Sequence, residues 1–116
     1  MKYIMLFAGE EPAPSAGSED EKFEVAPAYA AYIEAMVAAG VLLGGERLRP
    51  TSTATTVRTR NGKTEVLNGP YAETREQLGG YFLIEVANLD EALAWAARNP
   101  GAANGSIEVR PIWPKA

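Results

Sequence analysis

Apolar and polar positions along this chain alternate with a period of two in some segments and with helical spacing in others. The first apolar segment, 2–8, would place Tyr3 and Met5 on one face of a strand and Ile4 and Leu6 on the other. Because both faces are apolar, we expect a strand that is covered on both sides.

A helix is predicted after a loop rich in proline, glycine and acidic residues. Apolar residues in 23–39 follow helical spacing, and Gly40 is suited to end the helix. Pro27 lies in this window and leaves two alternatives open. It either marks the first turn of a helix over 27–39 or separates a preliminary turn from the main helix. The next residues, 41–52, are interrupted by paired glycines and a proline, and they predict a short extended piece and a connector.

A β-hairpin is predicted next, because two β-branched runs, 53–60 and 64–68, flank the turn signal Asn61-Gly62. The remaining segments predict a strand over 79–86, a helix over 89–98 and a strand over 105–113.

Asn88 and Glu91 are spaced as a capping box at the start of the second helix. The resulting order is β-α-β-β-β-α-β. When the return arm of the hairpin is taken as an extension, the order becomes β-α-β-β-α-β, a ferredoxin-like α+β arrangement with an antiparallel sheet. We expect one domain over 1–116.

Composition narrows the chemistry that this domain can perform. The chain has no cysteine and no histidine, which excludes disulfides, thiolate chemistry and imidazole groups. Its acidic residues do not follow the spacing of a calcium loop, so we expect no metal and no cofactor. A net charge of -4 without any Lys/Arg-rich run argues against nucleic-acid binding. The N-terminal apolar run is too short for a membrane span or a secretory signal, and we expect no membrane association and a cytoplasmic location.

The stretch "VRTRNGKTEVLNGPYAETREQLGGYFLIEVANLDEALAWAARNP", followed by "GSIEVRPIW", resembles the YCII-related proteins. More narrowly, it resembles the branch called the DGPF-domain family. The resemblance extends to "KYIMLF" and "AAGVLLGGERLRP" and is poorest over 9–25. It implies a bacterial homodimer, a dimeric α+β barrel in which the sheets of two ferredoxin-like protomers pack together. It also implies a gene that often lies near an extracytoplasmic-function sigma factor.

Two departures from the family pattern change what can be carried over. The Asp-Gly-Pro-Phe that names the branch is Asn68-Gly69-Pro70-Tyr71 here. Asn68 keeps the turn-forming chemistry without the carboxylate, and Tyr71 keeps the aromatic ring and adds a hydroxyl. The His/Asp pair associated with better-known YCII proteins has no counterpart in a chain without histidine, so that catalytic proposal does not apply.

Polar residues opposite the aliphatic faces of the predicted strands are the candidate site, since in such a barrel they would face its interior or mouth. The candidate ligand-binding residues are Arg58, Tyr71, Tyr81, Glu85, Glu108 and Arg110. If the protein is an enzyme, Glu85 or Glu108 would transfer the proton. Two interpretations remain open: ion pairs that fix the register of the dimer, favoured on general grounds, or a cleft in which an arginine binds an anion.

The segment 73–77 is interpreted as a solvated turn in preference to the edge of a pocket, and Trp95 and Trp113 as packing or interface residues. Two functions therefore stay open. The first is a binding protein or enzyme for a small organic molecule. An arginine without an ion-pair partner in the cleft would favour an anionic ligand. The alternative is a non-catalytic accessory or regulatory protein acting through its dimer or a protein partner, linked to a sigma factor by the family resemblance alone.

Overall fold

The computed structural model describes residues 1–11, 24–72 and 74–116. It is an α+β structure with two antiparallel sheets and two α-helices, compatible with a ferredoxin-like fold. The four-stranded sheet has the order β2-β5-β1-β6, and the second sheet is the hairpin β3-β4. The elements are β1 (Lys2–Gly9), α1 (Pro27–Ala38), β2 (Leu42–Arg47), η1 (Thr51–Thr53), β3 (Thr55–Arg60), β4 (Lys63–Asn68), β5 (Gln77–Glu85), α2 (Leu89–Arg98), η2 (Pro100–Ala103) and β6 (Ser106–Pro111).

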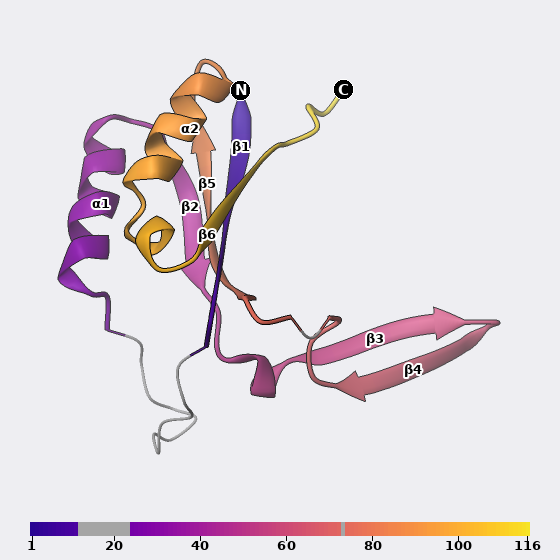
Figure 1. The fold of residues 1–116 in the computed structure, drawn as a ribbon. Helices are drawn as coiled ribbons and strands as arrows, with labels where there is room; N and C mark the ends of the chain where they lie inside the picture. Colours follow the sequence, from indigo (N-terminus) through magenta and orange to yellow (C-terminus); the bar gives the residue numbers. More distant parts are fainter. Residues whose placement is uncertain (12–23, 73) are drawn as a thin grey trace.

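Both α-helices lie on the same side of the four-stranded sheet (Figure 1). On this side, which we call the helix face, Tyr3 pairs with Ile84 and Met5 pairs with Val109 across neighbouring strands. Tyr3, Met5 and Ile84 are buried and belong to one hydrophobic core together with Met36 of α1. Burial of these side chains is the main source of the stability of the fold.

Tyr32 of α1 anchors the aromatic part of this core. Its ring meets those of Phe82 and Trp95 edge-on, at centroid distances of 5.8 and 6.2 Å. Its hydroxyl donates a hydrogen bond to the carbonyl oxygen of Trp95 at 2.7 Å. Burial raises the pKa of Tyr32 to about 12, because the phenolate would lose its hydration.

The opposite side of the same sheet, the open face, carries Ile4 and Leu6 of β1 and Tyr81 and Leu83 of β5. These four side chains are half-buried. In the register Leu6 lies between Tyr81 and Glu108, and Ile4 lies between Leu83 and Arg110. The open face therefore has an apolar centre, with charged residues on its outer strand. Among the described residues, helices cover β1 only on the helix face, so the expectation of cover on both sides is met on one side.

Helix boundaries follow the local signals. Pro27 is the first residue of α1, so it marks the first turn and does not break a longer helix. Asn88 caps α2 by accepting a hydrogen bond from the backbone N–H of Glu91 at 3.0 Å. The Glu91 carboxylate in turn accepts one from the backbone N–H of Ala87 at 3.0 Å. Among the described residues, no helix has the length and apolar composition needed to cross a membrane.

The hairpin β3-β4 is formed as predicted but does not join the main sheet. Asn61 and Gly62 both have positive φ, 53° and 75°, as the tight turn requires. The strand that pairs with β5 is Leu42–Arg47, part of the segment predicted as a short extended piece and a connector. Taking the return arm of the hairpin as an extension of a sheet strand was therefore wrong.

The paired glycines explain the error, because they were interpreted as a break, whereas both lie in β2 and Gly45 permits its pairing with β5. The register shifts between Leu42 and Gly44, which marks a bulge. A Cβ atom at Gly45 would lie 2.5 Å from the carbonyl oxygen of Tyr81, so only glycine allows so close an approach of the two strands.

Candidate functional site

The structure distributes the candidate site residues over three regions. Tyr81, Glu85, Glu108 and Arg110 lie on the open face or at its edges, in β5 and β6. Arg58 lies on the separate hairpin, where its Nε donates to Glu65 Oε2 at 3.0 Å.

Tyr71 follows the hairpin and is 84% exposed. The expectation that Arg58 shares a sheet face with Tyr81 was wrong, because β3 belongs to another sheet.

The candidates that share the open face do not form a single cluster. Arg110 Nε lies 3.7 Å from Glu108 Oε2 on β6, and both side chains are largely exposed. Tyr81 and Glu85 lie on β5, and β1 separates them from β6. Their roles as ligand-binding or catalytic residues stay predictions.

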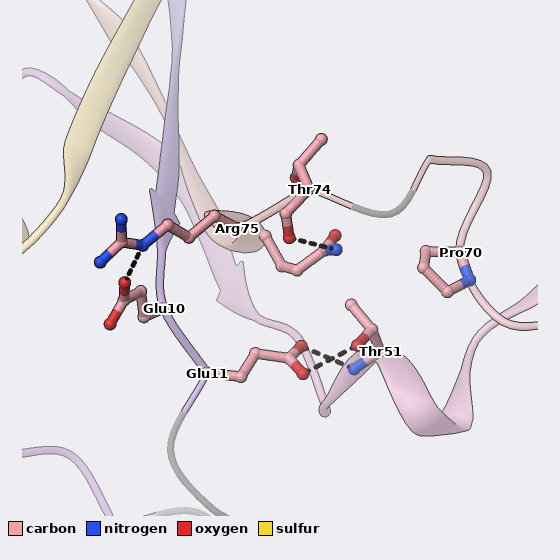
Figure 2. A pocket seen from close by; sticks show the side chains of 7 residues that line it. Glu10, Glu11, Thr51, Pro70, Thr74 and Arg75 are labelled. Carbon is pink, nitrogen blue, oxygen red and sulfur yellow. Dashed lines mark hydrogen bonds and ion pairs between the residues drawn. The ribbon is translucent and has the colours of Figure 1, made fainter.

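A hollow of about 490 Å³ lies instead at the end of β1, and we call it the polar cleft (Figure 2). Three segments far apart in the sequence form it: the end of β1, the start of η1, and the chain between β4 and β5. The residues that line it are Glu10, Glu11, Thr51, Pro70, Thr74, Arg75 and Gln77.

Glu11 and Thr51 form the best-defined contact in the polar cleft. The backbone N–H of Thr51 donates to Glu11 Oε1 and its hydroxyl donates to Glu11 Oε2, each at 2.7 Å (Figure 2). A carboxylate that accepts two hydrogen bonds from one residue is held in a fixed orientation. The contact joins residues 40 positions apart and ties the end of β1 to the chain that leads into the hairpin.

The opposite wall of the polar cleft is fixed by contacts of the segment before β5. Arg75 Nε donates to Glu10 Oε1, and Gln77 Nε2 donates to the carbonyl oxygen of Thr74 at 2.9 Å. The Arg75–Glu10 pair is exposed, so it orients the groups more than it stabilises the fold. Just outside, the hydroxyl of Ser106 donates to Glu76 Oε1 at 2.9 Å and ties the same segment to β6.

A second hollow of about 340 Å³ adjoins the first, and we call it the apolar hollow. Thr51, Pro70 and Gln77 line both. The rest of its lining is mainly apolar, with one arginine and one threonine: Leu48, Arg49, Pro50, Thr53, Ala54 and Leu78. A polar compartment and an apolar compartment thus meet along a shared wall. This arrangement suits a small molecule with a polar head and a short apolar part.

Sequence reasoning missed most of this cleft. Arg75 and Gln77 do edge a pocket, which is the interpretation that the sequence favoured less, while Glu73 lies outside the described residues. Glu10 and Glu11 carried one usable signal, since two carboxylates directly follow a buried strand. Within the described residues, no group of three or more acidic side chains is arranged to hold a metal ion.

The two tryptophans differ in environment. Trp95 is a packing residue, with its ring against Tyr32 and under the Arg98 guanidinium, which lies 4.4 Å from the ring centroid. Trp113 lies beyond β6 and is 90% exposed.

Comparison with known proteins gives a consistent result. The model of the YCII-related domain matches residues 1–116. A protein of Rhizobium meliloti (strain 1021), described as uncharacterized, is 43% identical over 114 residues, which cover 97% of this chain and 92% of the relative.

Proposed function

The chain belongs to the YCII-related family, and on that premise we propose that it is a homodimer whose protomers each bind a small polar organic molecule in the polar cleft. The observation that carries the binding role is the hollow of about 490 Å³ in which three distant segments are fixed by the Glu11–Thr51 and Glu10–Arg75 contacts. This volume lies in the range of about 300–1,000 Å³ that is typical of small-molecule sites.

The charges of the lining define the class of ligand. Glu10 and Glu11 supply two carboxylates and Arg75 one guanidinium, so acceptors outnumber cations. Arg75 already donates its Nε to Glu10. We therefore propose a ligand with hydroxyl or amino donors at its head, and with a short apolar portion in the hollow lined by Leu48 and Leu78. The sequence also allowed an anionic ligand, and the titration described below distinguishes the two classes.

The homodimer rests on the open face. Ile4, Leu6, Tyr81 and Leu83 form its apolar centre, and both helices lie on the other side of the sheet (Figure 1). An apolar sheet face of this kind is normally covered by another layer of protein. Membership of the DGPF branch and the regulatory role linked to a sigma factor stay predictions.

A matched set of probes tests the ligand class. We expect butylamine and butan-1-ol to shift the amide resonances of residues 10–11, 51 and 74–77 in a nuclear magnetic resonance titration of the isotope-labelled protein. Butyrate, with the same apolar chain and an anionic head, should shift them less, because it meets two carboxylates. A stronger response to butyrate would contradict the ligand class, and no response to any probe would contradict binding in the polar cleft.

Thr51→Val supplies the matching variant. It removes the hydroxyl that holds Glu11, and we expect it to weaken butylamine binding by about tenfold, the equivalent of one lost hydrogen bond to a charged group. Thr64→Val on the hairpin is the control, since Thr64 contacts Thr59 and does not line the cleft. Equal affinity in wild type and Thr51→Val would exclude this contact from binding.

A further inference from the structure

The hairpin β3-β4, which we call the arm (55–68), is supported by the rest of the chain chiefly at its base. There the backbone N–H of Gly69 donates to the carbonyl oxygen of Ala54 at 2.8 Å, and the hydroxyl of Thr56 donates to the carbonyl oxygen of Gly69 at 2.8 Å. Neither strand of the arm pairs with the four-stranded sheet. An isolated two-stranded hairpin is at best marginally stable in water, so an arm of this length needs a surface to lie against.

One face of the arm is apolar and uncovered. Val57 and Val66 lie directly opposite each other in the register and are 62% and 65% exposed. The other face carries the Arg58–Glu65 ion pair. Paired β-branched residues at the centre of a hairpin face are suited to packing against another protein surface.

The arm projects beyond the open face. In Figure 1 the helices lie on one side of the four-stranded sheet, and the arm extends from the end of the sheet toward the other side. The radius of gyration is 16.2 Å, whereas a compact chain of this length has one of about 13 Å. The region next to the open face thus has the sheet on one side and the arm on another.

The charges of the arm and of the remaining chain are complementary. The arm contains three basic residues and one acidic residue, so the remaining chain has eight basic and fourteen acidic residues. Near the tip, Arg60 and Lys63 have no carboxylate partner in the part of the chain that the structure describes. On the open face, Glu46 lies beside Tyr81 and likewise forms no ion pair with any described residue.

We infer that the arm of one protomer lies against a second copy of this chain seated on the open face. Val57 and Val66 pack on the second copy. Arg60 and Lys63 lie on the other face of the arm, beside its turn, and bring their positive charge to the tip near Glu46 of the second copy. The occupant is a second copy because the open face and the arm border one continuous space, and because the cationic tip matches the acidic body of the same chain. This inference rests on the proposed homodimer and adds to it an interface outside the sheet.

A spin label tests the contact directly. The chain has no cysteine, so Thr64→Cys provides a single attachment point for a nitroxide on the apolar face of the arm. Labelled chains without isotope enrichment are mixed with nitrogen-15 chains that carry no nitroxide. We expect the amides of residues 44–47 and 81–85 in the nitrogen-15 chains to lose intensity, because the nitroxide comes from another copy.

Valine substitutions supply the energetic test. Val57→Thr combined with Val66→Thr keeps β-branched residues in the hairpin and removes apolar surface, and should raise the dissociation constant of the dimer by about tenfold. Val37→Thr on α1 is the matched control, because Val37 is equally exposed at 61%, and it should leave the constant unchanged.

Three results would overturn the inference. A dimer in which the nitrogen-15 chains keep their intensity contradicts the arm contact and leaves the homodimer standing. A double valine variant that dimerises as tightly as wild type does the same. A monomer at all concentrations removes the homodimer and the arm contact together.

Discussion

Alternate residues of the same strands meet two different environments in this protein. On the helix face, Tyr3, Met5 and Ile84 are enclosed by α1 and α2. On the open face, their neighbours Ile4 and Leu83 stay half-buried, and neither helix of the described residues lies above them. Sequence neighbours with equal apolar character thus contribute differently to stability in a single protomer. The difference indicates that the chain completes one side of its sheet and leaves the other side for the proposed second copy to cover.

Ile84→Ala tests the helix face and should have the largest effect. Ile84 is 0% exposed and lies between Leu42 and Tyr3 in the sheet, so its replacement leaves a cavity in the core that the packed helices cannot fill. We expect the free energy of unfolding to fall by about 3 kcal/mol. Urea denaturation followed by circular dichroism measures this, and a loss below about 1 kcal/mol would show that the helix face is not the rigid core.

Leu83→Lys tests the open face. A lysine at the centre of the proposed dimer contact would bury an unpaired charge, and we expect the dissociation constant of the dimer to rise by about thirtyfold. The unfolding of the isolated protomer should change little, since Leu83 is only half-buried there. Leu93→Lys on α2 is the control, because Leu93 is exposed and lies on the other side of the sheet. Dimers of undiminished affinity for Leu83→Lys would contradict a dimer through the open face.

Tyr32 gives the helix face a dependence on pH. Its pKa is about 12 in the folded chain, and about 10 when unfolded. A raised pKa contributes stability that is fully present below pH 10 and is lost as the pH rises toward 12. We expect wild type to lose about 2 kcal/mol more than Tyr32→Phe over this window. Denaturation curves at stepwise pH check this, and parallel losses in the two proteins would exclude Tyr32 as the cause.

Local signals in the sequence predicted the elements well. Pro27 at the start of α1, the Asn88–Glu91 capping box and the Asn61-Gly62 turn each act over a few residues, so their consequences can be inferred from spacing alone. The pairing of strands cannot be inferred from spacing alone. In the sequence, Gly45 is typical of a break in a strand. That the position must lack a Cβ atom follows only from the close approach of the β5 backbone.

The polar cleft escaped prediction for the same reason. Glu11 and Thr51 are 40 positions apart, and no local pattern indicates that one carboxylate will accept two hydrogen bonds from the other residue. Arg75 and Gln77 were noticed because a charged segment lies between a turn and a strand, but the pairing of Arg75 with Glu10 depends on tertiary structure. Alternation predicted correctly that Tyr81 and Glu108 share a sheet face. It could not predict that Arg58 lies on another sheet.

The molar mass in solution tests most directly the claim that the open face belongs to a second copy. Light scattering coupled to size-exclusion chromatography at micromolar concentration should give twice the chain mass of 12.4 kDa for wild type. The same measurement should give the mass of one chain for Leu83→Lys. A wild-type protein that elutes with the mass of one 12.4 kDa chain at every concentration would contradict the account.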